Sequence, residues 1–538
     1  MTKNALPTTI SPVYPQGTDP ETWKSTEVGG GDISEFQLAV GHYMTEKYGM
    51  VVVSPRPDAE TGDFASTTAR HRWAYYDGVN DVRYEYPIKI YGGSAPHIFQ
   101  VINGPAWLTV GNDRTAANHG VLKGVPTQAY STENPASVTV RVYGQDGTTI
   151  DLSCTIATTA STTKFMFLSN SGNDITGDGS ISAPFATLPK MMGVSSITAT
   201  YPNRIVYMRG GDYATVAHTD AWNGGNAGEI IDSRIQLVKA NHPVCYIAYP
   251  DEDVNIDFSD AQILTGGPDF ALMGSSASRM TIQGSADNAA ETHNIWITEV
   301  ARGVIAWVTF DGFVPREAAN WTNSAPMFSP GGTGSNRRYW GFHDVQEINR
   351  TVQSANDGSL HVYFSTEYWV EDFCGHNRLS SGRGAGYKDT NFYTSVRYGN
   401  YYTIGDSESG FAFMCQNGSG DNEICYSKVK GPLWFNFQFT ESTTDHHAAR
   451  CTVYTTDSNY NQALRSWNGA VGPFTAENCV LVSNGSPQCH PAITSTGNEC
   501  HATVGGGNVP VNTTTLNLVD AGTAYRTLYL GTRGAEIA

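Results

Sequence analysis

The chain is poor in charged residues. Only 16% of its 538 residues carry a charge, against roughly 25% in an ordinary soluble domain. The 33 Lys and Arg residues are outnumbered by 51 Asp and Glu, which gives a net charge of −18. Without a basic surplus to neutralise phosphates, this composition argues against a nucleic-acid-binding protein. Aromatic residues make up 11% of the chain and exclude disorder, because disordered chains combine few aromatics with dense charge.

Long apolar runs are also missing. No stretch approaches the roughly 18 to 20 apolar residues that a membrane-spanning helix needs, so no membrane insertion is predicted. The first ten residues contain a single Lys with no apolar run behind it, unlike a secretory signal. The sequence therefore predicts a protein that is made in a cytoplasm without a signal peptide.

Features that bind metals and cofactors are equally scarce. The nine cysteines include no Cys-x-x-Cys pair, which argues against a disulfide framework and a zinc ribbon. No aligned Asp and Asn residues suggest a calcium site. The glycine-rich runs at 331–334 and 505–507 lack the Lys-Ser/Thr of a phosphate-binding loop. We therefore predict neither a metal nor a cofactor.

What the chain does contain is glycine, proline, small polar residues and aromatics, which favours an all-β, loop-rich fold with two to four domains. Residues 1–75 predict one helix at 32–47, with Asp32 as its N-cap and Glu35 in the capping-box position, followed by an apolar strand at 50–54. These elements cannot build a large core. We expect residues 1–75 to be an attachment or oligomerisation segment.

Residues 76–158 change to short alternating strands separated by turn residues, a pattern typical of an immunoglobulin-like β-sandwich. The Gly-Pro-Ala-Trp-Leu segment at 104–108 and the Gly-Val-Pro-Thr turn at 124–127 are both present. In these two features the segment resembles bacterial and phage immunoglobulin-like modules. The resemblance implies a fold and says nothing about chemistry.

A Thr/Ser-rich linker at 158–164 leads into the most specific motif of the chain, at 165–188. This motif has a first strand, a Gly-x-Asp element, a glycine-rich turn and a final Pro-Phe-x-Thr-Leu. It resembles the opening of right-handed parallel β-helix proteins of the pectate-lyase type, which process polysaccharides. The resemblance implies a short helix after the motif that caps the end of the β-helix. The matching residues are Gly172, Asp174, Gly177, Pro184, Phe185, Thr187 and Leu188.

Strand-like segments after the motif begin at Arg204 and Val244, and later ones begin at Trp340, Tyr368, Phe392, Glu423, Cys451 and Cys479. The starts from Trp340 onward fall roughly 22 to 31 residues apart. A period of 20 to 30 residues is typical of a solenoid, whereas propeller blades need about 40 to 50 residues. The predicted right-handed, single-stranded parallel β-helix covers residues 165–538. The spacing of Cys425, Cys451, Cys479 and Cys500 predicts that these side chains stack at equivalent inward positions.

Residues one coil apart in a parallel β-helix lie about 4.8 Å from each other, so catalytic groups can come from successive coils. Glycoside hydrolysis needs two carboxyl groups, and the acidic residues between 340 and 445 could supply them. The alternative is that these are turn or strand-end acids without a catalytic function. The predicted catalytic residues are Glu371, Asp372, Asp406 and Glu408.

A basic, glycine-rich segment at 374–389 suggests a second chemistry. A polysaccharide lyase neutralises a sugar carboxylate with basic side chains and removes the neighbouring proton. Aromatic rings nearby could pack against the apolar faces of sugars. The alternative is a solvated loop with ordinary surface cations. The predicted substrate-binding residues are His376, Arg378, Arg383, Lys388, Trp369 and Trp434.

Together these parts resemble a bacteriophage tailspike, a virion-associated polysaccharide depolymerase. The resemblance implies a homotrimer in the virion tail, attached through the N-terminal segment to a tail or baseplate protein, that binds capsule or O-antigen. Three functions stay open: an endo-glycosidase, which the paired carboxylates favour, a polysaccharide lyase, and a non-catalytic receptor-binding or structural tail protein.

Overall fold

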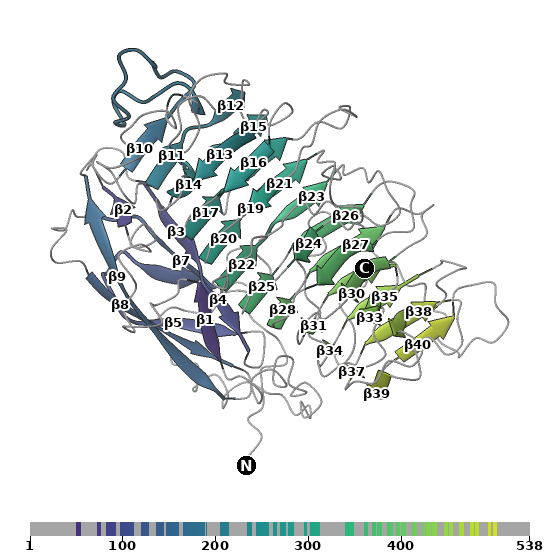
Figure 1. The fold of residues 1–538 in the computed structure, drawn as a ribbon. Coiled ribbons are helices and arrows are strands. Elements are labelled where there is room, and N and C mark those ends of the chain that lie inside the picture. Colours follow the sequence, from purple (N-terminus) through teal and green to yellow (C-terminus); the bar gives the residue numbers. More distant parts are fainter. Residues whose placement is uncertain are drawn as a thin grey trace.

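The computed structural model describes residues between 50 and 502, with gaps in most of the connecting loops. Residues 1–49 and 503–538 lie outside the described part, and so does the helix predicted at 32–47. The described part is all-β, as predicted, and most of its strands belong to parallel sheets. Figure 1 shows two groups of strands: the N-terminal sheets, β1 to β9, and a long stack of parallel sheets, β10 to β40.

The N-terminal sheets consist of four, three and two strands, in the orders β2-β9-β8-β5, β3-β7-β6 and β1-β4. The strand predicted at 50–54 is β1, and it pairs with β4. Both β1 and β2 fall within the predicted segment 1–75 yet pair with strands that follow it. The strands are β1 Val51–Ser54, β2 Trp73–Tyr75, β3 Tyr84–Pro87, β4 Lys89–Tyr91, β5 Ile98–Asn103, β6 Thr109–Gly111, β7 Val121–Gly124, β8 Ala136–Tyr143 and β9 Thr149–Thr159.

The two turn motifs of this region lie against each other. A Cβ added to Gly124 would lie 2.0 Å from the carbonyl oxygen of Trp107, closer than any real contact. Trp107 in turn packs edge-on against Tyr84, with ring centroids 6.1 Å apart. The motif therefore requires glycine at 124 because the Trp107 backbone occupies the space of a side chain.

From β10 onward the chain passes alternately through two long parallel sheets. The first long sheet has twelve strands and the second has eleven, and each strand pairs in parallel with the strand that the next coil contributes. The strands of the first long sheet are β10 Phe165–Leu168, β11 Ile205–Met208, β14 Val244–Ala248, β17 Asp269–Met273, β20 Arg302–Ala306, β22 Tyr339–His343, β25 Tyr368–Asp372, β28 Thr394–Tyr398, β31 Asn422–Cys425, β34 His446–Ala449, β37 Phe474–Glu477 and β39 Ile493–Thr496.

The second long sheet follows the first, a few residues later in each coil. Its strands are β12 Gly211–Ala214, β15 Val254–Asp257, β18 Met280–Gln283, β21 Val308–Asp311, β23 Gln346–Ile348, β26 Gly375–Arg378, β29 Tyr401–Ile404, β32 Lys428–Lys430, β35 Thr452–Tyr454, β38 Val480–Ser483 and β40 Glu499–Ala502.

Two shorter parallel sheets complete the coils. One contains β13 Arg234–Val238, β16 Gln262–Thr265 and β19 Ile295–Ile297. The other contains β24 Leu360–Tyr363, β27 Ala385–Thr390, β30 Phe411–Gln416, β33 Leu433–Phe437 and β36 Leu464–Ser466. Inward side chains of the sheets form one continuous core, which runs from Met166 to Ile493. Because side chains alternate along a strand, every second residue enters this core.

The predicted series of repeat strands is correct in part. The segments at Trp340, Tyr368 and Glu423 belong to the first long sheet, but those at Cys451 and Cys479 begin strands of the second. There the first long sheet continues instead at β34 and β37. Strands of both long sheets alternate apolar and polar residues, and within a coil they lie only a few residues apart. Spacing along the sequence therefore could not show which sheet a strand belongs to.

The four cysteines do not form one stack. Cys425 lies on β31 and pairs with Tyr398 and Ala449, whereas Cys451 and Cys479 occupy a corner position between the two long sheets. The corner stack that the structure contains is Cys374, Asn400, Ser427, Cys451 and Cys479. The Cys374 amide donates to the Asn400 side chain, and the Asn400 amide to the Ser427 hydroxyl. Cysteine here is one of several small residues that can accept this hydrogen bond. The described cysteines are free thiols.

The motif at 165–188 forms a closed turn at the start of the first long sheet. The Asp174 carboxylate accepts hydrogen bonds from the Ala186 and Thr187 amides and from the Thr187 hydroxyl. A Cβ on Gly172 would lie 2.5 Å from the Phe185 carbonyl oxygen, which explains the glycine there. Phe185 bridges to Leu168 and is buried. Leu188 and Lys190 are helical, at the start of the helix expected there, and the rest of that helix lies outside the described residues.

The N-terminal sheets cover the outer face of the first long sheet. Tyr75 of β2 packs edge-on against Phe165 and Phe167 of β10, with ring centroids 5.1 Å apart in both pairs. Outward side chains of β10 to β20 share one apolar cluster with the N-terminal sheets. Figure 1 shows this covering layer in purple and blue along one side of the stack. Within the described residues, no helix is long and apolar enough to span a membrane.

Candidate functional site

Two of the predicted catalytic residues, Glu371 and Asp372, are neighbours on β25. Side chains of successive strand residues point to opposite faces of a sheet. Glu371 is therefore directed into the core, where its strand partners are Phe342 and Arg397, and Asp372 is directed outward toward the N-terminal sheets. The two carboxylates thus face different environments and do not share a groove.

Glu371 is completely buried, and each of its two carboxylate oxygens accepts a hydrogen bond. The Trp369 indole donates to its Oε1 over 2.5 Å, and the Asn400 amide donates to its Oε2 over 2.9 Å. Arg397 Nε and His376 Nε2 lie 3.7 and 3.4 Å from the same Oε2. All of these partners are also buried.

This environment determines the protonation of the buried groups. Burial by itself raises the pKa of Glu371, but Arg397, His376 and the Trp369 hydrogen bond outweigh it and lower the pKa to about 2. Burial lowers the pKa of His376, but Glu347 and Glu371 outweigh it and raise the pKa to about 9. Glu371 is therefore ionised at neutral pH. An acid catalyst must instead be protonated and reach its substrate, so this geometry is that of a core ion network.

The network, which we call the buried ion network, extends along the core over three further coils. Arg397 donates to Asn422 over 3.1 Å, and Asn422 contacts the ring of His446 at 3.3 Å. The Tyr402 ring stacks on His376 with centroids 5.0 Å apart. The members are Glu347, Trp369, Glu371, His376, Arg397, Asn400, Tyr402, Asn422 and His446.

Asp372 takes part in a different cluster, at the junction with the N-terminal sheets. Lys89 Nζ of β4 lies 2.5 Å from each of its carboxylate oxygens. The His343 ring of β22 contacts both, with Nδ1 2.8 Å from Asp372 Oδ1 and 2.7 Å from Lys89 Nζ. Burial raises the pKa of Asp372, but His343 and Lys89 outweigh it and lower the pKa to about 2. We call these three residues the junction cluster.

The other predicted site residues are placed less completely. Asp406, Glu408 and Arg383 lie outside the described residues. Arg378, Lys388 and Trp434 lie on β26, β27 and β33, and the described part does not extend to their side chains. Of the predicted set, the structure brings Trp369, Glu371 and His376 together inside the core. The catalytic and substrate-binding assignments stay predictions.

The outer face of the second long sheet presents polar side chains that sequence reasoning missed. Asn255, Asp257 and Gln283 are exposed, and Asp311 is half-buried. In the register of the sheet, Asp257, Gln283 and Asp311 follow one another on β15, β18 and β21. Asn255 donates to the carboxylate of Asp212 on the preceding strand over 2.8 Å. We call this surface the polar ladder, and its members are Asp212, Asn255, Asp257, Thr281, Gln283 and Asp311.

A signal for the polar ladder is present in the sequence. The strands read Val-Asn-Ile-Asp at 254–257, Met-Thr-Ile-Gln at 280–283 and Val-Thr-Phe-Asp at 308–311. Each alternates an apolar inward residue with a polar outward one. Strands in parallel register repeat outward groups about every 4.8 Å. Such a row of amides, hydroxyls and carboxylates can hydrogen-bond the hydroxyl groups of an extended ligand.

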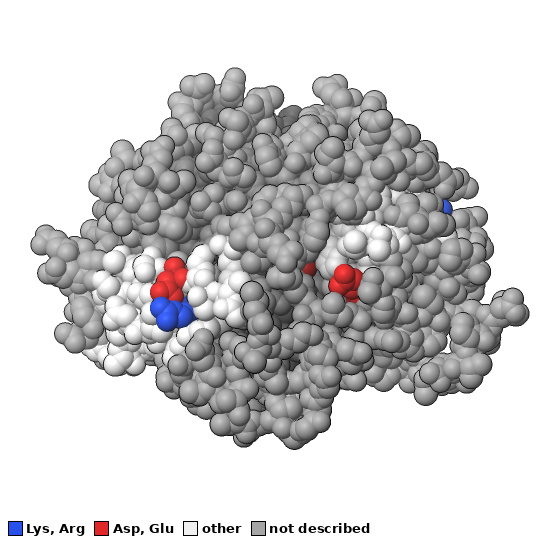
Figure 2. Space-filling model, turned by 90° about the horizontal axis from the view of Figure 1, so that it is seen from below, with Lys and Arg blue, Asp and Glu red and all other residues white. Residues whose placement is uncertain are grey.

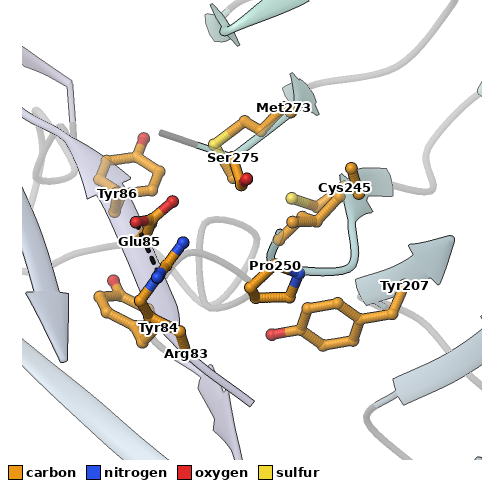
Figure 3. A pocket seen from close by; sticks show the side chains of 12 residues that line it. Arg83, Tyr84, Glu85, Tyr86, Tyr207, Cys245, Pro250, Met273 and Ser275 are labelled. Carbon is orange, nitrogen blue, oxygen red and sulfur yellow. Dashed lines mark ion pairs between the residues drawn. The ribbon is translucent and has the colours of Figure 1, made fainter. Parts of the chain in front are cut away.

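A cavity lies between the N-terminal sheets and the first long sheet. Its empty space is about 390 Å³, counted together with the solvent open to it. Figure 3 shows Tyr84 and Tyr86 of β3 on one side and Tyr207 and Pro250 on the other. Arg83 at its edge pairs with Glu85 at 2.8 Å and with Asp251 at 2.8 Å. Because its Arg is already paired twice, this recess offers little free charge to a ligand.

Charged side chains are sparse among the described residues of one face of the molecule. On the face drawn in Figure 2, described acidic and basic side chains occur in small separate groups, and the described part of that face contains no large basic patch. Among the described residues, no group of His, Cys, Asp and Glu is arranged to hold a metal ion.

Comparisons of the chain with family models, with curated proteins and with solved structures found no match.

Proposed function

We propose that the strands β10 to β40 form a right-handed parallel β-helix, that the N-terminal sheets form an immunoglobulin-like β-sandwich, and that the chain is a virion tail protein of the tailspike kind. Three features support this proposal. The opening motif closes the start of the first long sheet, the long sheets are parallel throughout, and the N-terminal sheets are largely antiparallel. Attachment to a tail or baseplate protein and assembly as a homotrimer are part of the same proposal.

The proposed function is binding of a host surface polysaccharide, capsule or O-antigen, along the polar ladder. One observation carries this proposal: outward polar side chains, exposed on β15 and β18 and half-buried on β21, recur in strict register over a packed core. A polysaccharide is an extended ligand with many hydroxyl groups, and a regular row of donors and acceptors suits it. The sparse basic charge favours a neutral or weakly charged polymer over a strongly anionic one.

Cleavage of the bound polymer by an endo-glycosidase is the catalytic part of the proposal. Asp257 and Asp311 are two strands apart on the polar ladder, which separates their backbones by about 9 to 10 Å. Inverting glycosidases hold their carboxyl groups about 6.5 to 9.5 Å apart, so side chains on this ladder can reach that distance. Asp406 and Glu408 stay candidates for the same reaction. A lyase that uses Arg378, Arg383 and Lys388 is the alternative chemistry.

The test is a panel of purified capsular and O-antigen polysaccharides incubated with the full chain. Binding is measured by calorimetry, fragments by mass spectrometry, and a lyase product by its new near-ultraviolet absorbance. The double variant Asn255→Ala with Gln283→Ala should weaken binding about tenfold or more, since each lost hydrogen bond is worth about 1 kcal/mol. Ser153→Ala, at an exposed position of β9, is the matched control. Unchanged binding in the double variant would remove the polar ladder from the proposal.

A further inference from the structure

The junction cluster joins three strands that are far apart in the sequence. Lys89 comes from β4 of the N-terminal sheets, and His343 and Asp372 come from β22 and β25 of the first long sheet. The side chains of Lys89 and His343 are 1% and 0% exposed, and that of Asp372 is 13% exposed. Bulk water therefore has little access to the contact between the amine and the carboxylate.

This contact is a short, bidentate ion pair. Lys89 Nζ lies 2.5 Å from both oxygens of the Asp372 carboxylate. A nitrogen this close to both oxygens also lies within van der Waals contact of the carboxyl carbon between them. Reacting groups held at such a separation react as if at very high concentration.

We propose that Lys89 and Asp372 form a side-chain amide bond, which links the N-terminal sheets covalently to the parallel sheets. His343 is the proton carrier of this reaction, because its Nδ1 lies 2.7 Å from Lys89 Nζ and 2.8 Å from Asp372 Oδ1.

The reaction is balanced without any further reactant. The Lys89 ammonium passes a proton to the Asp372 carboxylate, which gives a neutral amine and a carboxylic acid. The amine lone pair attacks the carboxyl carbon and forms the C–N bond of a tetrahedral intermediate. His343 takes a proton from the nitrogen and returns it to the hydroxyl oxygen. The C–O bond breaks, one water leaves and the amide remains.

Burial favours the neutral amine that the reaction needs, whereas the low pKa of Asp372 makes the protonated acid the minor form from which the reaction proceeds. Burial lowers the pKa of Lys89, because the ammonium loses its hydration. Trp307 packs edge-on against His343 with ring centroids 5.2 Å apart and fixes the orientation of the imidazole. The neighbouring pairs Arg279–Asp344 and Arg83–Asp251 contain arginine instead. A guanidinium stays protonated, so it cannot act as the nucleophile in this way.

The decisive measurement is the intact mass of the full chain under denaturing, reducing conditions. The wild-type chain should be lighter than its sequence by the mass of one water, about 18 Da. Trypsin should fail to cleave after Lys89, and a branched peptide containing both residues should appear. A wild-type chain of full mass that trypsin cleaves after Lys89 would overturn the proposal, whatever the variants do.

Four variants test which side-chain atoms take part in the reaction. Lys89→Arg keeps the positive charge and should restore the full mass, and Asp372→Ala should do the same. Asp372→Asn should form the same bond with loss of ammonia in place of water. His343→Gln should leave a larger uncrosslinked fraction at early times after synthesis in a cell-free reaction, whereas a purely packing function of His343 would leave that time course unchanged.

Discussion

The interior of the early coils differs from that of the later ones. Between β11 and β21 the core is apolar, with residues such as Val254, Ile256 and Ile282 in the inward positions. From β23 to β34 the same positions hold the buried ion network, including Glu371, Arg397 and His446. One backbone architecture therefore accepts two kinds of core. The apolar core depends on the volume of each side chain, whereas the polar core depends on every charge having its partner.

The largest effect should come from removing one charge of the network. Arg397→Ala leaves Glu371 buried without its cation and should lower the free energy of unfolding by about 3 to 5 kcal/mol. Urea unfolding followed by circular dichroism measures this change. A loss below about 1 kcal/mol would mean that the later coils tolerate unpaired charge, and the contrast between the two cores would not hold.

A truncation in the apolar core is the matching experiment. Ile256→Ala removes buried apolar volume and should lower the free energy of unfolding by about 2 to 4 kcal/mol. Ile282→Val, one coil further on, should cost only about 1 kcal/mol because it removes a single methyl group. If both substitutions cost the same, side-chain volume does not control this part of the core.

The two cores should also differ in their response to pH. His376 has a folded pKa of about 9, above its unfolded value near 6.5, so its contribution is complete below pH 6.5 and is lost as the pH rises through 9. Glu371 has a folded pKa of about 2, so its contribution is present above about pH 4.3 and is lost as the pH falls toward 2. Stability should thus be highest between about pH 4.5 and 6.5.

Urea midpoints at pH 5.5, 7.5 and 9.5 test this expectation. The wild-type midpoint should fall as the pH rises, which corresponds to a loss on the order of a few kcal/mol in the free energy of unfolding. His376→Gln should remove most of the alkaline decline, whereas Ile282→Val should leave its slope unchanged. An equal alkaline decline in His376→Gln would assign the pH dependence to other groups.

The smallest effect is expected at the corner stack. Cys374→Ser keeps a small polar side chain where neighbouring coils already use Asn400 and Ser427. The change in the free energy of unfolding should stay within about 1 kcal/mol, because a hydroxyl can make the same hydrogen bonds as the thiol. A larger loss would show that the thiol packs in a way that a hydroxyl cannot replace.

Much of the fold could be predicted from the sequence. The alternation within strands and the motif at 165–188 were sufficient for an all-β chain with parallel sheets. The sequence also places Trp340 and Trp369 at equivalent positions of successive strands, and the two residues are partners in the register of the first long sheet. These features depend on local patterns of two residues or on spacings of one coil.

The candidate site was less predictable. Glu371 and Asp372 are adjacent in the sequence, but the side of the strand that each faces, and what covers that side, depends on the whole assembly. Asp372 contacts Lys89, which is 283 residues away in the sequence, and no local sequence pattern predicts that contact. The polar ladder was different, because its three strands repeat one alternation that the sequence displays. Asp257 and Asp311 are single acidic residues on their strands, so a search for clusters of acidic residues does not find them.

The covering of the first long sheet by the N-terminal sheets has a consequence for synthesis. The apolar surface that β2 and β4 cover is built from strands that extend as far as β25. At about 5 to 20 residues per second, a ribosome needs roughly 15 to 60 seconds to proceed from Lys89 to Asp372. The strands made first must therefore wait, with an uncovered apolar face, for partners that are made much later. The N-terminal sheets are early in the chain, but their packing against the parallel sheets is completed late, and during that interval the uncovered apolar face is exposed to aggregation.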